Sequence, residues 1–249
     1  LVLRKSVIVV LACVCGVTAV YFGGQKAEEA VQTLATRPPY EPPTIVLDAG
    51  HGGSDYGATY NGRAEKDDNL KLALAVGDIL EKNGIDVVYT RTTDEYETPF
   101  KKATDANDAK ADYFVSIHRN SSPTPNQYTG VETLVYNNSG IKSQMAANIN
   151  SELEKAGFKN LGITERPNLV VLKRTKMPAV LVEAGFINND KDNETFDKNF
   201  NQIANGIADG ILKTLGIKPK TNNTTAQAAS GEVSSVKSDS AKSAEIMPA

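Results

Sequence analysis

The sequence is poor in cysteine. Its two cysteines, Cys13 and Cys15, both lie in an apolar run near the N-terminus, so residues 16 to 249 have none. A disulfide framework and a thiolate metal site are therefore excluded for that part of the chain. Val10-Leu11-Ala12 before Cys13 also matches poorly the small-residue box that precedes a lipid-modified cysteine.

An excess of charge of either sign is also missing. The chain has 27 Lys and Arg against 30 Asp and Glu, a formal net charge of -3. We expect no nucleic-acid partner, because phosphate binding needs clustered Lys and Arg. Hydrophobic residues make up 40% and charged residues 23% of the 249 positions, which is typical of one folded domain with extensions.

The two ends differ from the middle of the chain. Residues 1–24, with Arg4 and Lys5 before an uncharged run, indicate a signal peptide or an N-terminal membrane anchor. Both alternatives predict that the protein lies outside the cytoplasm, either membrane-anchored or secreted. The proline pairs in residues 25–43 favour a stiff linker, and residues 218–249, rich in Ser, Ala and Lys, predict a disordered tail.

Between these flanks, residues 44–217 alternate strand and helix patterns, which predicts a single α/β domain. We expect a twisted six-stranded sheet, mostly parallel or mixed, with helices on both faces. The predicted strands are 44–47, 86–89, 113–117, 131–136, 169–172 and 179–182. The predicted helices cover about 67–82, 101–110, 141–157 and 203–215, and the stretch 159–168, with Gly162 and Pro167, reads as a loop.

The only two histidines each follow a predicted strand. His51 lies in Ala49-Gly50-His51-Gly52-Gly53, and His118 lies in Ser116-Ile117-His118-Arg119-Asn120. A single histidine is more often structural than a ligand, but ligands in open α/β sheets collect beyond the carboxyl ends of strands. The position of both histidines therefore indicates a metal site.

Two glutamates are candidates to complete that site. Glu65 precedes the first long helix, where its alternative role is a first-turn carboxylate that interacts with the helix dipole. Glu183 ends the apolar run 179–182, so it lies either at the open end of the sheet or paired in the core. Two imidazoles and a carboxylate suit Zn²⁺ with one position open for water, and Glu183 would then act as general base on that water.

Several segments together resemble the zinc-dependent N-acetylmuramoyl-L-alanine amidases of the amidase 3 type. The similarity runs from about residue 43 to 216, in the same order and with similar spacing. The segments are 45–58, 65–70, 106–107, 111–112, 116–120, 130–132 and 178–188. The resemblance implies one zinc ion held by His51, Glu65 and His118, with Glu183 as the catalytic glutamate. It also implies a six-stranded sheet and hydrolysis of the amide between N-acetylmuramic acid and L-alanine in peptidoglycan.

The sequence departs from the family pattern at three positions. Tyr56 replaces a usual proline, Lys102 a usual arginine, and Arg119 a usual small residue. We expect Arg119 to alter the rim of the substrate groove, and Asn120 is a candidate substrate-binding residue.

Two other functions stay open. One is a catalytically inactive wall-binding module, although such modules usually lose a ligand or the base. The other is a zinc peptidase that cuts within the stem peptide; His-Glu-x-x-His is absent, which excludes the large zincin group alone.

The sequence also bears on regulation. Some members of the resembled family carry an extra helix after the strand that corresponds to 131–136, and this helix blocks the zinc until a partner removes it. Here only Asn137 to Gly140 separate that strand from the next predicted helix. Four residues cannot form a helical plug, so we expect activity on peptidoglycan without an obligatory activator.

Overall fold

The computed structural model of the protein describes residues 41–220. The predicted leader or anchor, most of the predicted linker and most of the predicted tail lie outside these residues. Within residues 41–220, none of the helices has both the length and the apolar character that a membrane crossing requires.

A six-stranded sheet forms the centre of the domain, in the order β4-β1-β5-β8-β6-β7. Neighbouring strands are parallel except for β6 and β8, which pair antiparallel. The predicted mixed six-stranded sheet is thus confirmed. The strands are β1 (Thr44–Ala49), β4 (Asp86–Tyr89), β5 (Tyr113–Asn120), β6 (Val131–Val135), β7 (Asn160–Glu165) and β8 (Ala179–Phe186).

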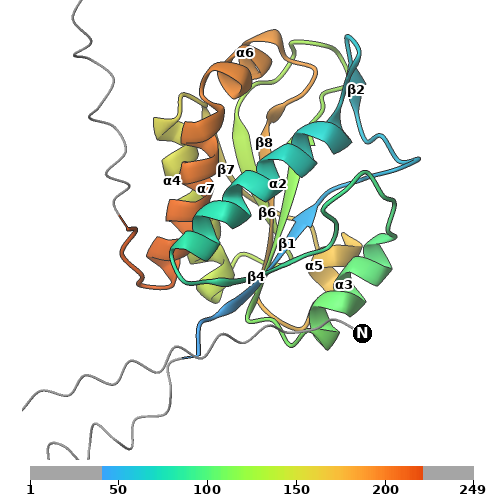
Figure 1. The fold of residues 1–249 in the computed structure, drawn as a ribbon. Coiled ribbons are helices and arrows are strands. Elements are labelled where there is room, and N and C mark those ends of the chain that lie inside the picture. Colours follow the sequence, from blue (N-terminus) through green and yellow to red (C-terminus); the bar gives the residue numbers. More distant parts are fainter. Residues whose placement is uncertain (1–40, 221–249) are drawn as a thin grey trace, which may run out of the picture. The chain divides into compact units, whose positions relative to one another are not determined.

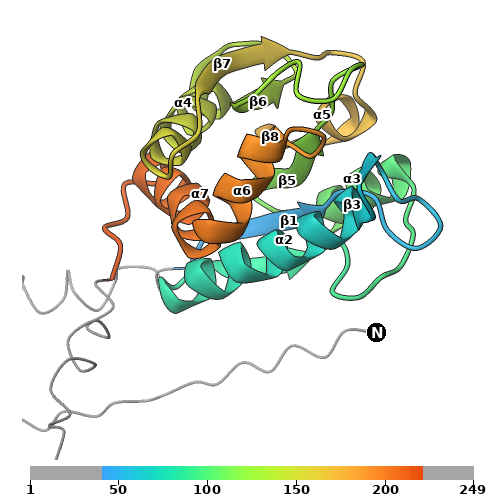
Figure 2. The same ribbon diagram turned by 90° about the horizontal axis from the view of Figure 1, so that it is seen from above.

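Helices cover both faces of the sheet, as predicted (Figure 1; Figure 2). On one face, α2 (Glu65–Lys82), α4 (Gly140–Lys155) and α7 (Phe200–Thr214) share one large apolar cluster with the sheet. On the other face, α3 (Pro99–Asp108) and α5 (Val170–Arg174) enclose a smaller cluster. The remaining described elements are the hairpin of β2 (Thr59–Tyr60) and β3 (Arg63–Ala64), and helix α6 (Asp190–Lys198).

Local sequence explains the elements that carry the site. In α2, Leu72, Val76 and Leu80 repeat every four residues and are fully buried, so this helix packs one apolar face on the sheet. Its first turn is acidic, which suits the positive end of the helix dipole. Helix α3 begins where the Thr98 hydroxyl accepts a hydrogen bond from the Lys101 amide, with Pro99 in the first turn.

Two predicted elements differ from the structure. The predicted strand 169–172 is wrong, because Val170–Arg174 form helix α5. Its apolar run satisfies a strand pattern, but Val171 and Leu172 are buried while Val170 is exposed, and short apolar runs do not distinguish strand from helix. The predicted loop 159–168 is also wrong, because Asn160–Glu165 form β7. This edge strand pairs only with β6, and edge strands tolerate polar residues.

Helix α6 was not predicted either. Its sequence, DKDNETFDK, contains one large apolar residue, Phe196, and therefore lacks an apolar stripe. Polar contacts anchor it instead. The side chain of Asn189 caps its first turn by accepting from the Asp192 amide, and Asp192 accepts hydrogen bonds from the amides of Gly130 and Phe186 at 2.8 Å.

Candidate metal centre and cleft

The three predicted metal ligands converge at the carboxyl end of the sheet. His51 lies in the loop after β1, Glu65 is the first residue of α2, and His118 belongs to β5. One ligand atom from each lies within 4.8 Å of the other two. These three residues come from segments far apart in the sequence, and among residues 41–220 they form the one cluster of this kind.

His51 is held in an unusual backbone conformation by its own loop. Its φ is 60°, in the left-handed region that non-glycine residues rarely adopt. Reciprocal backbone hydrogen bonds between Gly52 and Asp55 close the loop. The Asp55 carboxylate lies 2.8 Å from His51 Nδ1, which leaves Nε2 turned toward Glu65 at 3.3 Å. A carboxylate that fixes the second nitrogen is the usual support of a metal-binding histidine.

Two glycines leave the space that the ligands occupy. A Cβ on Gly50 would lie 2.3 Å from His118 Nε2, and a Cβ on Gly57 would lie 2.6 Å from His51 Cδ2 and 2.7 Å from Glu65 Oε2. Gly57 also has a positive φ of 66°. Any side chain at either position would therefore displace a predicted ligand.

The Glu65 carboxylate accepts three hydrogen bonds from three different segments. One oxygen accepts from the Ala58 amide at 2.9 Å, and the other accepts from the Arg119 amide and the Asn69 side chain, each at 3.2 Å. His118 Nδ1 is 2.8 Å away. Burial raises the pKa of Glu65, but His118 and His51 outweigh burial and hold the pKa well below its usual value. Glu65 is therefore a buried carboxylate anion.

The charge of Glu65 in turn acts on His51. Burial lowers the pKa of His51, but Glu65 and then Asp55 outweigh burial and raise the pKa to about 9. A divalent cation that takes the place of this proton meets two imidazole nitrogens and one carboxylate. Zinc bonds of about 2.0–2.2 Å place tetrahedral donors about 3.4 Å apart, within the spacing observed here. The donor set and its spacing fit a zinc ion.

Glu183 lies beside this cluster. In the sheet register, it stands opposite His118 of β5 on one side and opposite Glu132 of β6 on the other. Its Oε2 is buried and has no hydrogen-bond partner among residues 41–220. Burial, and then the charges of Glu65 and Glu132, raise the pKa of Glu183 to about 7, although His118 opposes the rise. A carboxyl group that titrates near neutral pH can both take and return a proton.

Asn120 and Arg119 point to opposite sides of β5. The Asn120 amide donates to Glu132 at 2.7 Å, and its oxygen accepts from the Ser121 amide, so Asn120 contacts the residue that stands opposite Glu183 in the sheet. Arg119 does not border a groove, contrary to the sequence expectation. It is 2% exposed, pairs with Asp68 at 2.6 Å and stacks on Phe196. Side chains alternate along a strand, so the neighbour of an outward His118 points inward.

A cleft of about 260 Å³ opens beside the two histidines. Its lining includes Asp48 and Leu181 of the sheet, Pro99 at the start of α3 and Val170 at the start of α5. Asp48 is fully buried, pairs with Lys102 at 2.7 Å and accepts from Ser116 at 2.6 Å. Burial raises the pKa of Asp48, but Lys102 outweighs it and the pKa stays below its usual value.

Sequence reasoning missed the residues that join the ligand segments. The buried Arg91 guanidinium donates to the carbonyls of Ala49 and Gly50, just before His51, and to that of Lys66, just after Glu65. Asp94 accepts from the Gly53 amide and from Lys66 Nζ. An Arg and an Asp three residues apart after a strand give no recognisable metal signal. Only their contacts show that they hold the two ligand segments together.

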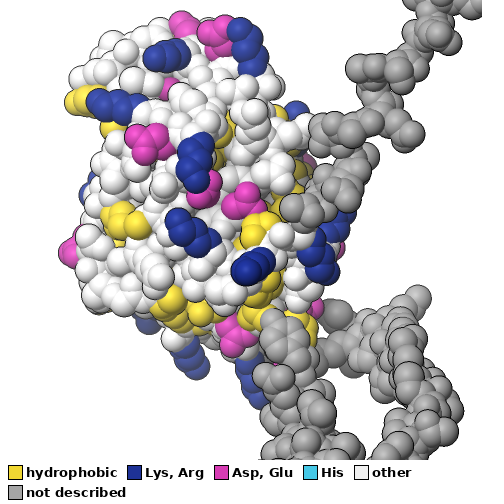
Figure 3. Space-filling model, turned by 90° about the vertical axis from the view of Figure 1, so that its left-hand side faces the viewer, with side chains coloured by type: hydrophobic (Ala, Val, Ile, Leu, Met, Phe, Trp, Pro, Cys, Tyr) yellow, Lys and Arg dark blue, Asp and Glu magenta, His cyan; other side chains and the backbone are white. Residues whose placement is uncertain are grey.

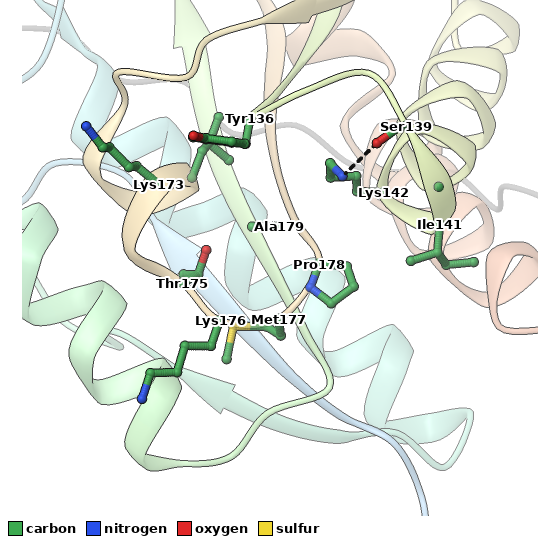
Figure 4. A pocket seen from close by; sticks show the side chains of 12 residues that line it. Tyr136, Ser139, Ile141, Lys142, Lys173, Thr175, Lys176, Met177, Pro178 and Ala179 are labelled. Atoms are coloured by element: carbon green, nitrogen blue, oxygen red, sulfur yellow. Dashed lines mark hydrogen bonds between the residues drawn. The ribbon is translucent and has the colours of Figure 1, made fainter.

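A larger hollow of about 510 Å³ lies at the opposite end of the sheet, between the start of α4 and the segment after α5 (Figure 4). Lys173 and Lys176 point away from it, and Lys142 turns toward Ser139. The molecular surface on the α4 and α7 side mixes positive and negative side chains without a field of one sign (Figure 3). The lining of this hollow includes no histidine and no carboxylate side chain.

The family comparison agrees with this geometry. Residues 45–213 match the model of the Amidase_3 family, described as N-acetylmuramoyl-L-alanine amidase. The chain is 38% identical over 184 residues to an endolysin of Bacillus phage SPP1, covering 71% of this chain and 68% of the phage protein. It is 37% identical to the sporulation-specific N-acetylmuramoyl-L-alanine amidase of Bacillus subtilis, covering 72% and 71%.

A solved structure is similar as well. The catalytic domain of CwlV, an N-acetylmuramoyl-L-alanine amidase from Bacillus (Paenibacillus) polymyxa, superposes with a TM-score of 0.65 at 37% identity. The aligned region covers 71% of this chain and 99% of that domain.

Proposed function

This chain belongs to the Amidase_3 family of N-acetylmuramoyl-L-alanine amidases, and we propose that it hydrolyses the bond between N-acetylmuramic acid and L-alanine with zinc held by His51, Glu65 and His118. The convergence of these three ligand atoms within 4.8 Å carries the proposal. Asp55, which fixes His51, and the hydrogen bonds to Glu65 support it, because metal sites need such oriented ligands.

Glu183 is proposed as the general base and acid. A bound zinc ion supplies a Lewis acid that polarises the amide carbonyl and makes water more acidic. Glu183 takes the proton of the attacking water, and then gives a proton to the leaving nitrogen as the C–N bond breaks. Burial raises the pKa of Glu183 in the metal-free protein to about 7, so its carboxylate is a stronger base than that of an exposed glutamate.

Peptidoglycan fragments separate this function from the two others. The full chain is incubated with isolated peptidoglycan and the soluble products are identified by mass. Amidase activity releases intact stem peptides, a peptidase releases shortened ones, and a wall-binding module releases none. Chelation should abolish release and zinc should restore it, and full activity of a metal-free preparation would overturn the zinc proposal.

Ligand replacement tests the assignment residue by residue. His118→Ala removes one of three ligands, so bound zinc should fall well below one equivalent and activity should disappear. Lys173→Ala, an exposed residue of α5, is the matched control and should keep both zinc and activity. A His118→Ala protein that retains a full equivalent of zinc would remove His118 from the ligand set.

Regulation and location are further parts of the proposal. Strand β6 ends at Val135 and α4 begins at Gly140, so the connection between them is too short for a plugging helix. We expect the purified full chain to act on peptidoglycan without a partner protein, and inactivity that a partner relieves would refute this.

Action at the cell wall places the domain outside the cytoplasm, whether anchored or secreted. Protease added to intact spheroplasts should digest it.

A further inference from the structure

An exposed tyrosine lies directly beside the predicted metal ligands. Tyr56 is 55% exposed, more than any other large hydrophobic residue within 41–220 except Phe100. It follows Asp55, whose carboxylate contacts His51, and its carbonyl accepts the Lys66 amide in the first turn of α2, next to Glu65. Tyr56 therefore belongs to the loop that carries His51, and its backbone is hydrogen-bonded to the helix turn that carries Glu65.

The ring of Tyr56 is fixed on one face and open on the other. Lys66 Nζ lies 4.1 Å from the ring centroid, a cation–π contact. Lys66 cannot move away easily, because the Gly53 carbonyl at 2.8 Å and the Asp94 carboxylate at 2.7 Å hold its ammonium group. One face of the Tyr56 ring thus contacts Lys66, while the residue as a whole stays 55% exposed to solvent.

The aromatic surface extends beyond Tyr56. Tyr96 is 49% exposed and packs against Gly53, since a Cβ on Gly53 would lie 3.1 Å from Tyr96 Cβ. The two tyrosines thus flank the same short segment of the His51 loop. Scattered exposed aromatics need no explanation, but Tyr56 and Tyr96 both lie against the loop that carries His51, a predicted metal ligand.

We propose that Tyr56 is a platform on which a pyranose ring of the glycan strand stacks during hydrolysis. The inference rests on the proposed function, which places a sugar on one side of the scissile amide. A flat, rigid aromatic face offers apolar contact to the C–H face of a sugar at a small entropic cost, because its side chain is already immobilised. The sugar is either the N-acetylmuramic acid that carries the scissile amide or its neighbour in the strand.

The structure permits a set of matched variants at this position. Tyr56→Phe keeps the ring, whereas Tyr56→Ala removes it. Tyr56→Pro also removes it and loses no backbone hydrogen bond, because the Tyr56 amide makes none within residues 41–220. Two unrelated ring deletions and one ring-preserving change therefore separate stacking from damage to the loop.

Kinetics on two soluble substrates test the platform in the full chain. One is a glycan fragment of several sugars with stem peptides, and the other is N-acetylmuramic acid with one stem peptide. Tyr56→Ala and Tyr56→Pro should raise KM about 3- to 10-fold on the longer fragment, while Tyr56→Phe stays near the parent. The kcat and the zinc affinity should not change. An equal rise on the single-sugar substrate identifies N-acetylmuramic acid as the stacked ring, and a rise on the longer fragment alone identifies the neighbour.

Two results would overturn the platform. One is an unchanged KM in both ring deletions, and the other is a loss of zinc affinity that accounts for the change. Binding of peptide-free glycan strands gives a second readout that needs no hydrolysis. If the parent chain releases no stem peptides, the proposed function fails, yet weaker glycan binding by Tyr56→Ala than by Tyr56→Phe would still support the platform. Equal glycan binding by those two variants would reject it.

Discussion

Strands β1, β5 and β8 differ between their first halves and their carboxyl ends. The first halves are apolar and fully buried, as at Ile45, Val115 and Val180. At the carboxyl ends, the same strands carry Asp48, His118 and Glu183. Asp48 pairs with Lys102 and His118 contacts Glu65, whereas the buried Oε2 of Glu183 has no hydrogen-bond partner within residues 41–220. Burial of apolar side chains stabilises the first halves. Burial of charged groups at the carboxyl ends costs stability.

This difference teaches that stability and chemistry are separated along each strand rather than between strands. The apolar halves hold the strands in register, and that register places His118 opposite Glu183. The carboxyl end of β8 can then keep the raised pKa of Glu183, and the loop after β1 can keep the positive φ of His51. Changes at the two ends should therefore have different consequences.

The largest effect is expected at the carboxyl end of β8. Glu183→Gln keeps the shape of the side chain but cannot accept a proton, so kcat should fall about 10²- to 10⁴-fold. Bound zinc should remain, because Glu183 is assigned outside the ligand set. Activity on peptidoglycan and zinc content are measured on the same preparation. Loss of zinc in this variant would make Glu183 a ligand and revise the role of Glu65.

The opposite pattern is expected in the apolar half of β1. Ile45 is fully buried, so Ile45→Ala should lower the free energy of unfolding by about 2–5 kcal/mol. Zinc affinity and kcat, measured well below the unfolding temperature, should stay close to the parent. If Ile45→Ala does not fold, Ile45→Val at about 0.5–1.5 kcal/mol keeps the comparison possible. A large loss of zinc affinity in a folded variant would show that the two halves are coupled.

A pH series can expose the cost of holding Glu183. The unfolded chain ionises this group near its ordinary pKa of 4.5, whereas the metal-free folded protein does so near 7. The folded state therefore binds more protons between these values, so this group's contribution falls as the pH rises toward 7. Metal-free Glu183→Gln should be more stable than the parent at pH 8, by at most about 3 kcal/mol, and similar near pH 4.5.

Denaturant unfolding at several pH values measures this difference. Ser151→Ala, on α4 away from the site, changes no ionisable group and is the control, so its effect should not vary with pH. A gap between Glu183→Gln and the parent that does not grow with pH would mean that Glu183 is not held neutral.

A smaller effect on zinc affinity is expected at Arg91, which joins the segments that carry His51 and Glu65. Arg91→Lys keeps the charge but offers one ammonium group where the guanidinium donates to four carbonyls, those of Ala49, Gly50, Lys66 and Thr93. Zinc affinity should fall about 10-fold or somewhat more, as is typical when support of metal ligands is removed. The exposed Arg174→Lys is the matched control. A cobalt-substituted sample whose visible spectrum matches the parent would argue against displaced ligands.

The fold was largely readable from the sequence, with two informative failures. Apolar runs followed by polar residues predicted five of the six strands, and residues repeating every four predicted the long helices. The run 169–172 failed because four apolar residues fit both a strand and a turn of helix. The edge strand 160–165 failed because an edge position removes the need for an apolar pattern.

The sequence by itself determined where each strand changes from apolar to polar, and this located His51, His118 and Glu183 at one end of a sheet. Tertiary structure alone decided which groups meet there. Strand order placed Glu132 opposite Glu183, and alternation turned Arg119 inward to Asp68. Arg91, in the loop after β4, contacts both ligand segments. The reason is physical: burial patterns are local and repeat along the chain, whereas these contacts join residues 25 or more positions apart or depend on which strands become neighbours.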